Sequence, residues 1–150
     1  MEASEKLTKK FQIGALSPGC NTAMIVALII NKSDSRRIVS KKDGKERWVT
    51  TFTLRDSPLD MINLTLWSDR DHAISLKHNY HIGEVVEVVR PRILQRDPNG
   101  RDSHYHPSVT SWLHLLFVDG KSRMAPYLGD SAPFSKILRI PSKASSAFLR

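Results

Sequence analysis

Residues 47–67 read RWVTTFTLRDSPLDMINLTLW and alternate twice between apolar and polar positions. A period of two indicates a β-strand with one buried face, and the Asp56-Ser57-Pro58 stretch between the two halves is a turn signal. The stretch therefore predicts an antiparallel hairpin, with strands over 47–55 and 62–67. The apolar positions are Trp48, Phe52, Leu54, Ile62, Leu64 and Leu66, and the opposite positions are Arg47, Thr51, Thr53, Arg55, Asn63, Thr65 and Trp67.

The chain on either side of this hairpin predicts three more strands and a helix. The run 21–32 is apolar on both faces, which is typical of a strand that is buried on both sides or bent between two sheets. Asp69 can cap a helix over 70–80 that Gly83 ends. Pro91 predicts an edge position or a bulge within the fourth strand. The remaining segments are a polar basic loop with a turn at Asp43-Gly44, the fourth strand, a long loop and a fifth strand, over 33–46, 84–95, 96–108 and 110–118 respectively.

This order of elements predicts an all-β fold with one helix, the OB-fold. It is a five-stranded Greek-key barrel with a helix between the third and fourth strands, and it binds ligands over strands 2 and 3, between the 1–2 and 4–5 loops. We expect a flexible N-terminal arm over 1–18, the OB-fold domain over 19–141, and a tail or linker over 142–150.

The composition of the 150 residues indicates one domain with an ordinary core, since 40% are hydrophobic and 25% are charged. A single cysteine excludes an intrachain disulfide framework and fits a reducing compartment. The longest apolar run, 23–30, is too short to span a bilayer, and the first residues lack the apolar core of a secretory signal. We therefore expect a cytosolic or nuclear protein without a membrane partner.

The net charge of +8 points to a polyanionic partner, and its distribution along the chain is uneven. Residues 36–55 hold seven basic residues against two acidic ones, a net charge of +5, whereas residues 56–89 hold two against six, a net charge of −4. Residues 90–106 carry a net charge of +2 and residues 121–150 a net charge of +5. The first and third of these segments contain the two loops that flank the ligand-binding face of an OB-fold, so the sequence predicts a positive groove.

Such a groove suits single-stranded nucleic acid, which needs cations along its phosphates and aromatic faces on which bases stack. Trp67 is the proposed stacking platform, although it could instead cover a barrel end or pack under the tail. Tyr105 could close over a base from the opposite side, or pack locally in its loop. The predicted contacts are Lys41, Lys42, Lys45, Arg47, Thr51, Thr53, Arg55, Asn63, Thr65, Trp67, Arg92, Arg96, Arg101 and Tyr105. Arg90 is a further candidate for phosphate contact.

Other aromatic and titratable side chains could have structural, metal-binding or catalytic roles. Trp48 has core parity, and Trp112 and His114 could either extend the binding face or be covered. His104 and His106 lack the partners of a zinc site, so no metal and no cofactor are expected. A metal-dependent nuclease would need converging carboxylates. The candidates are Asp56, Asp60, Asp69 and Asp71, and none is assigned a catalytic role.

The pattern GKERWVTTFTLRDSP…NLTLWSDRDHAISL…HIGEVVEV…PRILQR resembles the first OB domain of the meiosis-specific OB-domain proteins (MEIOB and the insect relative hold'em), which are paralogues of the large subunit of replication protein A. The resemblance runs from about 21 to 141. Its most specific part is FTLRDSP followed by a strand that ends in Trp-small-Asp. Trp67 also occupies the place where replication protein A-type domains carry a base-stacking aromatic residue.

The resemblance implies single-stranded DNA binding in meiotic homologous recombination, that is, double-strand-break repair and crossover formation on chromosomes in the nucleus. It implies replication protein A and other meiotic recombination proteins as candidate partners. Family members carry further OB domains, so we expect this chain to correspond to the first domain or to a short version. A 3′-to-5′ single-strand exonuclease activity is attributed to the family, and these residues offer no evident active site for it. The main alternative is a protein-interaction OB domain whose groove takes an acidic segment of a recombination partner.

Overall fold

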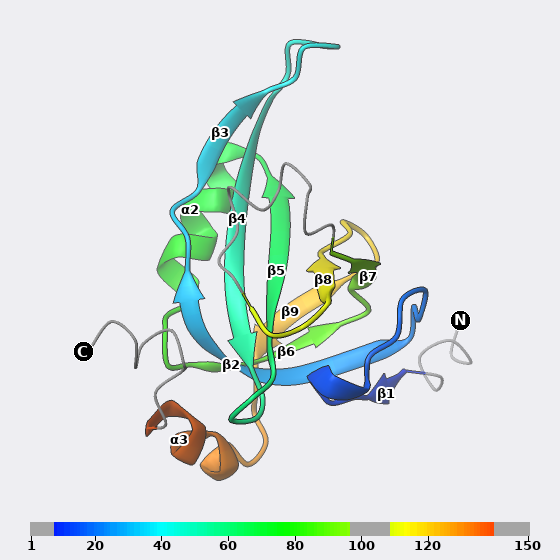
Figure 1. The fold of residues 1–150 in the computed structure, drawn as a ribbon. Coiled ribbons are helices and arrows are strands. Elements are labelled where there is room, and N and C mark those ends of the chain that lie inside the picture. Colours follow the sequence, from blue (N-terminus) through cyan, green and yellow to red (C-terminus); the bar gives the residue numbers. More distant parts are fainter. Residues whose placement is uncertain (1–7, 97–108, 140–150) are drawn as a thin grey trace, which may run out of the picture.

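The computed structural model describes residues 8–96 and 109–139 as a β-rich fold with two α-helices (Figure 1). Strands that are far apart in the chain lie side by side in one curled sheet. In chain order, the elements are β1 (Lys9–Lys10), the 3₁₀ turn η1 (Ile13–Ala15), β2 (Ala23–Lys32), β3 (Arg36–Val39), β4 (Glu46–Arg55), β5 (Met61–Ser68), α2 (Arg70–Asn79), β6 (Val85–Val89), β7 (Arg92–Gln95), β8 (Leu113–Leu116), β9 (Arg123–Pro126) and α3 (Ala132–Arg139).

The sheet has the strand order β7-β8-β5-β4-β2-β6-β9, and it curls into a half-barrel (Figure 1). β6 and β7 lie toward opposite ends of this path, yet only Arg90 and Pro91 separate them in the chain. Arg90 has a positive φ of 54°, and its N–H donates to the carbonyl of Ala23 at 2.8 Å. The bend thus splits the predicted fourth strand at Pro91 into two strands that pair with different parts of the sheet, β6 with β2 and β9, and β7 with β8. β5 and β8 pair in parallel, and the predicted OB-fold is confirmed.

The apolar strand β2 bends between two partners, which was one of the two alternatives for its pattern. Residues 24–28 pair with β6, and residues 28–32 pair with β4, with a register shift between Ile29 and Asn31. Because β2 serves both halves of the sheet, its side chains from Ile25 to Ile29 are buried on both faces.

The core fills the barrel with the alternate apolar residues of the central strands, together with the inner face of α2. Phe52, Leu54, Ile62, Leu64 and Leu115 are fully buried. Asp69 caps α2, since its Oδ1 accepts a hydrogen bond from the N–H of His72 at 2.7 Å. Ala73 and Leu76 then face the core, and Ile74 stays exposed. The predicted helix and its cap are confirmed.

Three parts of the chain differ from the sequence-based expectation. Residues 36–39, expected within a polar loop, form β3 and extend the β4 strand into a long hairpin (Figure 1). The segment 9–16, expected to be a loose arm, pairs with β2 through β1 and buries Ile13 in the core. β9 and α3 were not predicted. No helix of the described residues is long and apolar enough to cross a membrane.

Candidate nucleic-acid interface

The alternation of the central strands places a row of side chains on the outer face of the barrel. Cross-strand pairs Thr51–Thr65, Thr65–Leu116 and Leu116–Arg92 align residues from four neighbouring strands. A second row joins Thr53, Asn63, His114 and Leu94. A third joins Arg36, Val49 and Trp67. We call these three rows the outer face. The structure therefore brings together most of the residues predicted on strands 2 and 3.

The prediction that strands 2 and 3 present their polar side chains to solvent is wrong for five residues, four on the outer face and Arg55 beyond its second row. Thr51, Thr53, Arg55, Asn63 and Thr65 are each between 2% and 4% exposed. Alternation identifies the face on which a side chain lies, but not whether further chain covers that face. Burial is tolerated because the polar atoms have partners: Thr53 Oγ1 donates to Asn63 Oδ1, and Thr65 Oγ1 pairs with His114 Nε2, both at 2.8 Å. These residues form a hydrogen-bonded floor.

Among the β4 and β5 residues of this face, Trp67 is the exception, because 44% of its surface is exposed. It lies near the end of β5 and pairs with Val49 at the root of the β3–β4 hairpin. On the same side of the hairpin, Ile38 and Arg47 are opposite each other and both are exposed. An open indole thus lies beside a basic, projecting hairpin, which is an arrangement suited to stacking a base while cations contact its phosphates.

The tip of the hairpin carries the three predicted lysines, Lys41, Lys42 and Lys45, and all three are exposed. The predicted turn is confirmed: Gly44 has a φ of 67°, and its N–H donates to the carbonyl of Ser40 at 2.9 Å. Nearby acidic groups are engaged locally. The N–H of Lys45 donates to the Asp43 carboxylate and holds the pKa of Asp43 below its usual value. The Arg37 guanidinium lies 2.9 Å from the Glu46 carboxylate and likewise lowers the pKa of Glu46.

Two predicted cations have structural bonds. Arg55 donates through Nε to the carbonyl of Ser57 at 3.0 Å and also bonds the carbonyl of Pro58, which holds the turn after β4. Arg96 Nη1 donates to the carbonyls of Val109 and Ser111 at 2.9 and 2.8 Å, so it joins the chain after β7 to the chain before β8. Arg92, by contrast, is exposed at the β7 edge of the outer face.

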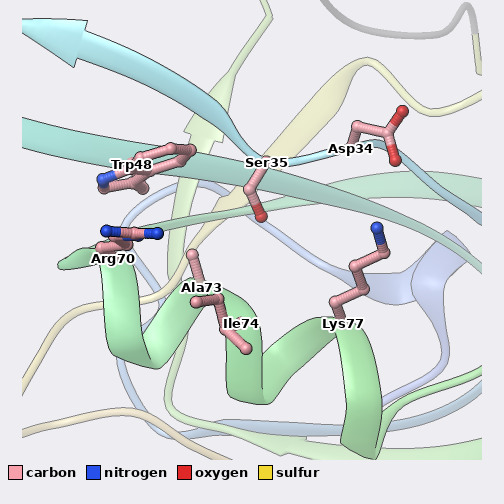
Figure 2. Close-up of a pocket in the computed structure, with 7 residues that line it drawn as sticks. All are labelled: Asp34, Ser35, Trp48, Arg70, Ala73, Ile74 and Lys77. Carbon is pink, nitrogen blue, oxygen red and sulfur yellow. The ribbon is translucent and has the colours of Figure 1, made fainter.

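The parity of Trp48 had predicted a place in the core, but Trp48 does not belong to the central core cluster. It is half-buried, and its Nε1 donates to Glu46 Oε1 at 2.9 Å. Figure 2 shows it on β4, facing Arg70 on α2 across a pocket of about 350 Å³. Ala73, Ile74 and Lys77 from α2, with Asp34 and Ser35 from the chain before β3, complete the lining.

The carboxylates considered for a nuclease have local partners. Asp56 Oδ2 accepts a hydrogen bond from the N–H of Ile13 at 2.7 Å, Asp60 Oδ2 accepts one from Ser57 Oγ at 2.8 Å, and Asp69 caps α2. Burial raises the pKa of Asp56. Asp71 lies in the first turn of α2. Within 8–96 and 109–139, no group of three or more His, Cys, Asp or Glu side chains is arranged to hold a metal ion.

Some predicted residues lie outside the part of the chain that the structure describes, namely Arg101 and Tyr105, as well as His104 and His106. Sequence reasoning also missed residues that the fold brings to the outer face and to the hairpin beside it. Arg36 and Ile38 belong to the unpredicted strand β3, although the β-branched pair Ile38-Val39 before the Asp43-Gly44 turn was an available signal. His114 had been left open, and its bond to Thr65 now places it on this face.

Three comparisons relate this chain to known proteins. A family model described as the MEIOB N-terminal OB domain matches residues 6–143. A meiosis-specific with OB domain-containing protein of Rattus norvegicus is 31% identical over 134 residues, which cover 87% of this chain and 28% of that protein. The protein hold'em of Drosophila melanogaster is 27% identical over 149 residues, which cover 94% of this chain and 30% of hold'em. The chain thus spans less than a third of the length of these curated relatives.

Among solved structures, DNA binding domain A of replication protein A from S. cerevisiae is similar with a TM-score of 0.60 and 18% identity, covering 83% of this chain and 99% of that domain. A replication protein A heterotrimer described as bound to single-stranded DNA gives a TM-score of 0.65 with 17% identity, covering 88% of this chain and 26% of that chain. At these identities the likeness shows a shared OB-fold.

Proposed function

The chain belongs to the family of MEIOB N-terminal OB domains, and on that premise we propose that it binds single-stranded DNA without strong sequence preference. The observation that carries the proposal is the exposed indole of Trp67, between the polar outer face and the basic β3–β4 hairpin. A base stacks on Trp67, while Lys41, Lys42, Lys45 and Arg47 contact the phosphates. The buried threonines and Asn63 hold the floor on which these contacts are arranged.

The similar folds support this proposal. One is described as a DNA binding domain and another as part of a heterotrimer bound to single-stranded DNA. The relative from Rattus norvegicus is named as a meiosis-specific protein. We propose that the domain acts in meiotic homologous recombination, on chromosomes in the nucleus during double-strand-break repair and crossover formation. Replication protein A and other meiotic recombination proteins are its proposed partners.

A titration of the domain with labelled oligo-dT and with duplex DNA, followed by fluorescence anisotropy at low salt, tests the proposal. We expect binding to the single strand to be tighter. Trp67→Ala should weaken it by about 1–3 kcal/mol, the range for loss of one stacked base, with an unchanged circular dichroism spectrum.

Trp112→Ala is the matched control, because Trp112 is 76% exposed and belongs to none of the three rows of the outer face. It lines a pocket together with Gly14 and Asp60. Its loss should leave the affinity for oligo-dT unchanged. If the domain has no single-strand affinity, or if Trp112→Ala weakens binding while Trp67→Ala does not, the proposed interface is wrong.

The pocket of Figure 2 favours a second candidate function, capture of an acidic protein segment. It lies on the opposite side of the hairpin from Trp67 and combines the apolar surface of Trp48 and Ile74 with the cations Arg70 and Lys77. Asp34 is the single acidic residue among its described lining side chains. An apolar side chain in the pocket, with carboxylates beside it, would complement this lining.

A labelled peptide of alternating glutamate and leucine is a direct probe of this pocket. We expect it to bind at low salt and to lose at least about tenfold in affinity in Arg70→Glu/Lys77→Glu, because the charge complementarity is reversed. Affinity of the same variant for oligo-dT should persist. Equal peptide binding by wild type and variant would remove this candidate.

A further inference from the structure

A groove of about 870 Å³ lies beside β7, at the edge of the outer face. Three separate segments form it: residues 18–22 before β2, residues 90–95 through the bend into β7, and Val118, Gly120 and Lys121 after β8. Its volume is more than twice that of the pocket beside α2, which is about 350 Å³. The groove is therefore large enough for a polymeric ligand rather than a single ion.

The positive charge of the groove lining favours an anionic ligand. Arg90, Arg92 and Lys121 line it, and its described lining residues include no aspartate or glutamate. Asp119 belongs to the same turn as Lys121 but does not line the groove. Arg90 Nε donates to Thr8 Oγ1 at 3.1 Å, which fixes this side chain at one wall. Arg92 and Lys121 are exposed and are available to phosphate oxygens.

The groove and the outer face share a wall. Arg92 and Leu94 take part in the cross-strand rows through Leu116 and His114, and both also line the groove. The row from Thr51 to Arg92 crosses four strands, which at ~4.8 Å per spacing is about 14 Å. A strand that follows this row away from the β3–β4 hairpin therefore leaves the outer face over β7 and meets the groove next.

We infer that the groove beside β7 extends the path of single-stranded DNA, with Lys121, Arg92 and Arg90 contacting the phosphates of nucleotides that have passed β7. This inference rests on the proposed function, since the outer face must first bind the strand. The apolar side chains of Pro91, Ile93 and Leu94 in the groove offer surface to the bases. The domain would then bind a longer strand than its outer face alone can hold.

Oligo-dT of graded length tests the extension. Strands of about 6, 9, 12 and 18 nucleotides cover most of the range of roughly 4–16 nucleotides that one OB domain binds, and exceed its upper limit. We expect wild-type affinity to rise with length. Lys121→Glu should lose about tenfold on the longest strands and less than about twofold on the shortest, because only long strands reach the groove.

Arg123→Glu makes the same charge reversal on β9, at an exposed residue that does not line the groove, and serves as the control. Equal losses in the two variants, or a Lys121→Glu loss that does not depend on length, would overturn the inference. Wild-type protein that binds none of the strands would instead refute the proposed function, so the two failures are distinguishable.

Cys20, the only cysteine of the chain, gives a second readout that does not depend on affinity. It is partly exposed and lines the groove. Oligo-dT of about 18 nucleotides should slow alkylation of Cys20 by iodoacetamide, followed by mass spectrometry, whereas strands of about 6 nucleotides should not. Polyglutamate, an anionic polymer without bases, is the comparison that shows whether any polyanion protects Cys20. Protection by polyglutamate equal to that by long oligo-dT, or no protection by long oligo-dT, would overturn the inference.

Discussion

Asp56 illustrates how one buried carboxylate links the fold to pH. Its Oδ2 accepts a hydrogen bond from the N–H of Ile13, and its Oδ1 is buried without a hydrogen-bond partner among the described residues. Burial raises its pKa above the usual 3.8, and the neighbouring Asp60 adds to the effect. The folded state therefore holds the Asp56 proton more tightly than the unfolded state does.

The sign of the pH dependence follows from this raised pKa. The stabilising contribution of Asp56 is fully present below pH 3.8 and is lost as the pH rises through the raised value. Asp56→Asn should remove this dependence, so the free energy of unfolding of wild type should fall relative to the variant as the pH rises. Urea unfolding at a series of pH values measures the difference. Asp119→Asn, in an exposed turn, is the control. A wild-type-minus-variant difference that is constant with pH would contradict the assignment.

Three residues of the outer face show how much of the site the sequence could predict. Alternation correctly placed Thr51, Thr65 and Trp67 on one face, because the side-chain period of a strand is local. It could not predict that Thr65 is buried, because its partner His114 arrives 49 residues later on β8. Exposure of a strand residue depends on the rest of the chain, so only Trp67 kept its predicted exposure among the β5 residues.

The β3–β4 hairpin is the element that extends the barrel into a basic arm (Figure 1). Its lysines are exposed, while the nearby carboxylate of Glu46 is paired with Arg37. If Lys41 and Lys42 each contact one phosphate, Lys41→Ala/Lys42→Ala should make the slope of log K against log salt concentration shallower by about 1.4, because each contact on a single strand contributes about 0.7. Anisotropy titrations of oligo-dT between low and moderate salt measure this slope.

The control for this prediction changes as much charge elsewhere. Lys77→Ala/Arg123→Ala removes two exposed cations from α2 and β9 and should leave the slope unchanged. A similar change of slope in both double variants would mean that net charge, rather than contact at the hairpin tip, sets the salt dependence.

Elements were predicted well where the hydrophobic pattern was long. The alternation of 47–67 and the capped helix after Asp69 gave β4, β5 and α2. β3 was missed because only Ile38 and Val39 in 33–46 are apolar, and four lysines and arginines surround them before the turn. β3 forms because it pairs with β4, which continues past the barrel. The residue pattern of β3 alone therefore gives little indication of a strand.

The molecule as a whole depends on the segment before β2. Ile13 is 2% exposed in the core, Phe11 and Leu16 pack against the core, and the Ile13 N–H bonds Asp56. Ile13→Ala should therefore lower the free energy of unfolding by about 2–5 kcal/mol, as for other large-to-small core changes. Urea denaturation followed by tryptophan fluorescence measures the loss.

Ile82 is 58% exposed, so Ile82→Ala makes the same chemical change outside the core and should have an effect of less than about 0.5 kcal/mol. An Ile13→Ala variant as stable as Ile82→Ala would show that the segment is dispensable, in agreement with the loose arm that its polar composition had suggested.

The OB-fold was predictable from the order of strands and helix, but the pairing that curls the sheet was not. The curl depends on the bend at Arg90 and Pro91 and on the parallel pairing of β5 with β8. Pro91 signalled an irregularity, which the bend confirmed. No local pattern could identify β8 as the neighbour of β5, since that pairing joins residues about 50 positions apart and is determined by the whole chain.

The parallel β5–β8 pairing also has a consequence during synthesis on the ribosome. β5 ends at Ser68 and β8 ends at Leu116, so 48 further residues must be added before the two strands can pair. At about 5–20 residues per second, the nascent chain carries the unpaired backbone edge of β5 for roughly 2–10 s. An unpaired edge is a template for strands of other chains, so release of the chain before β8 is made would yield an aggregation-prone product.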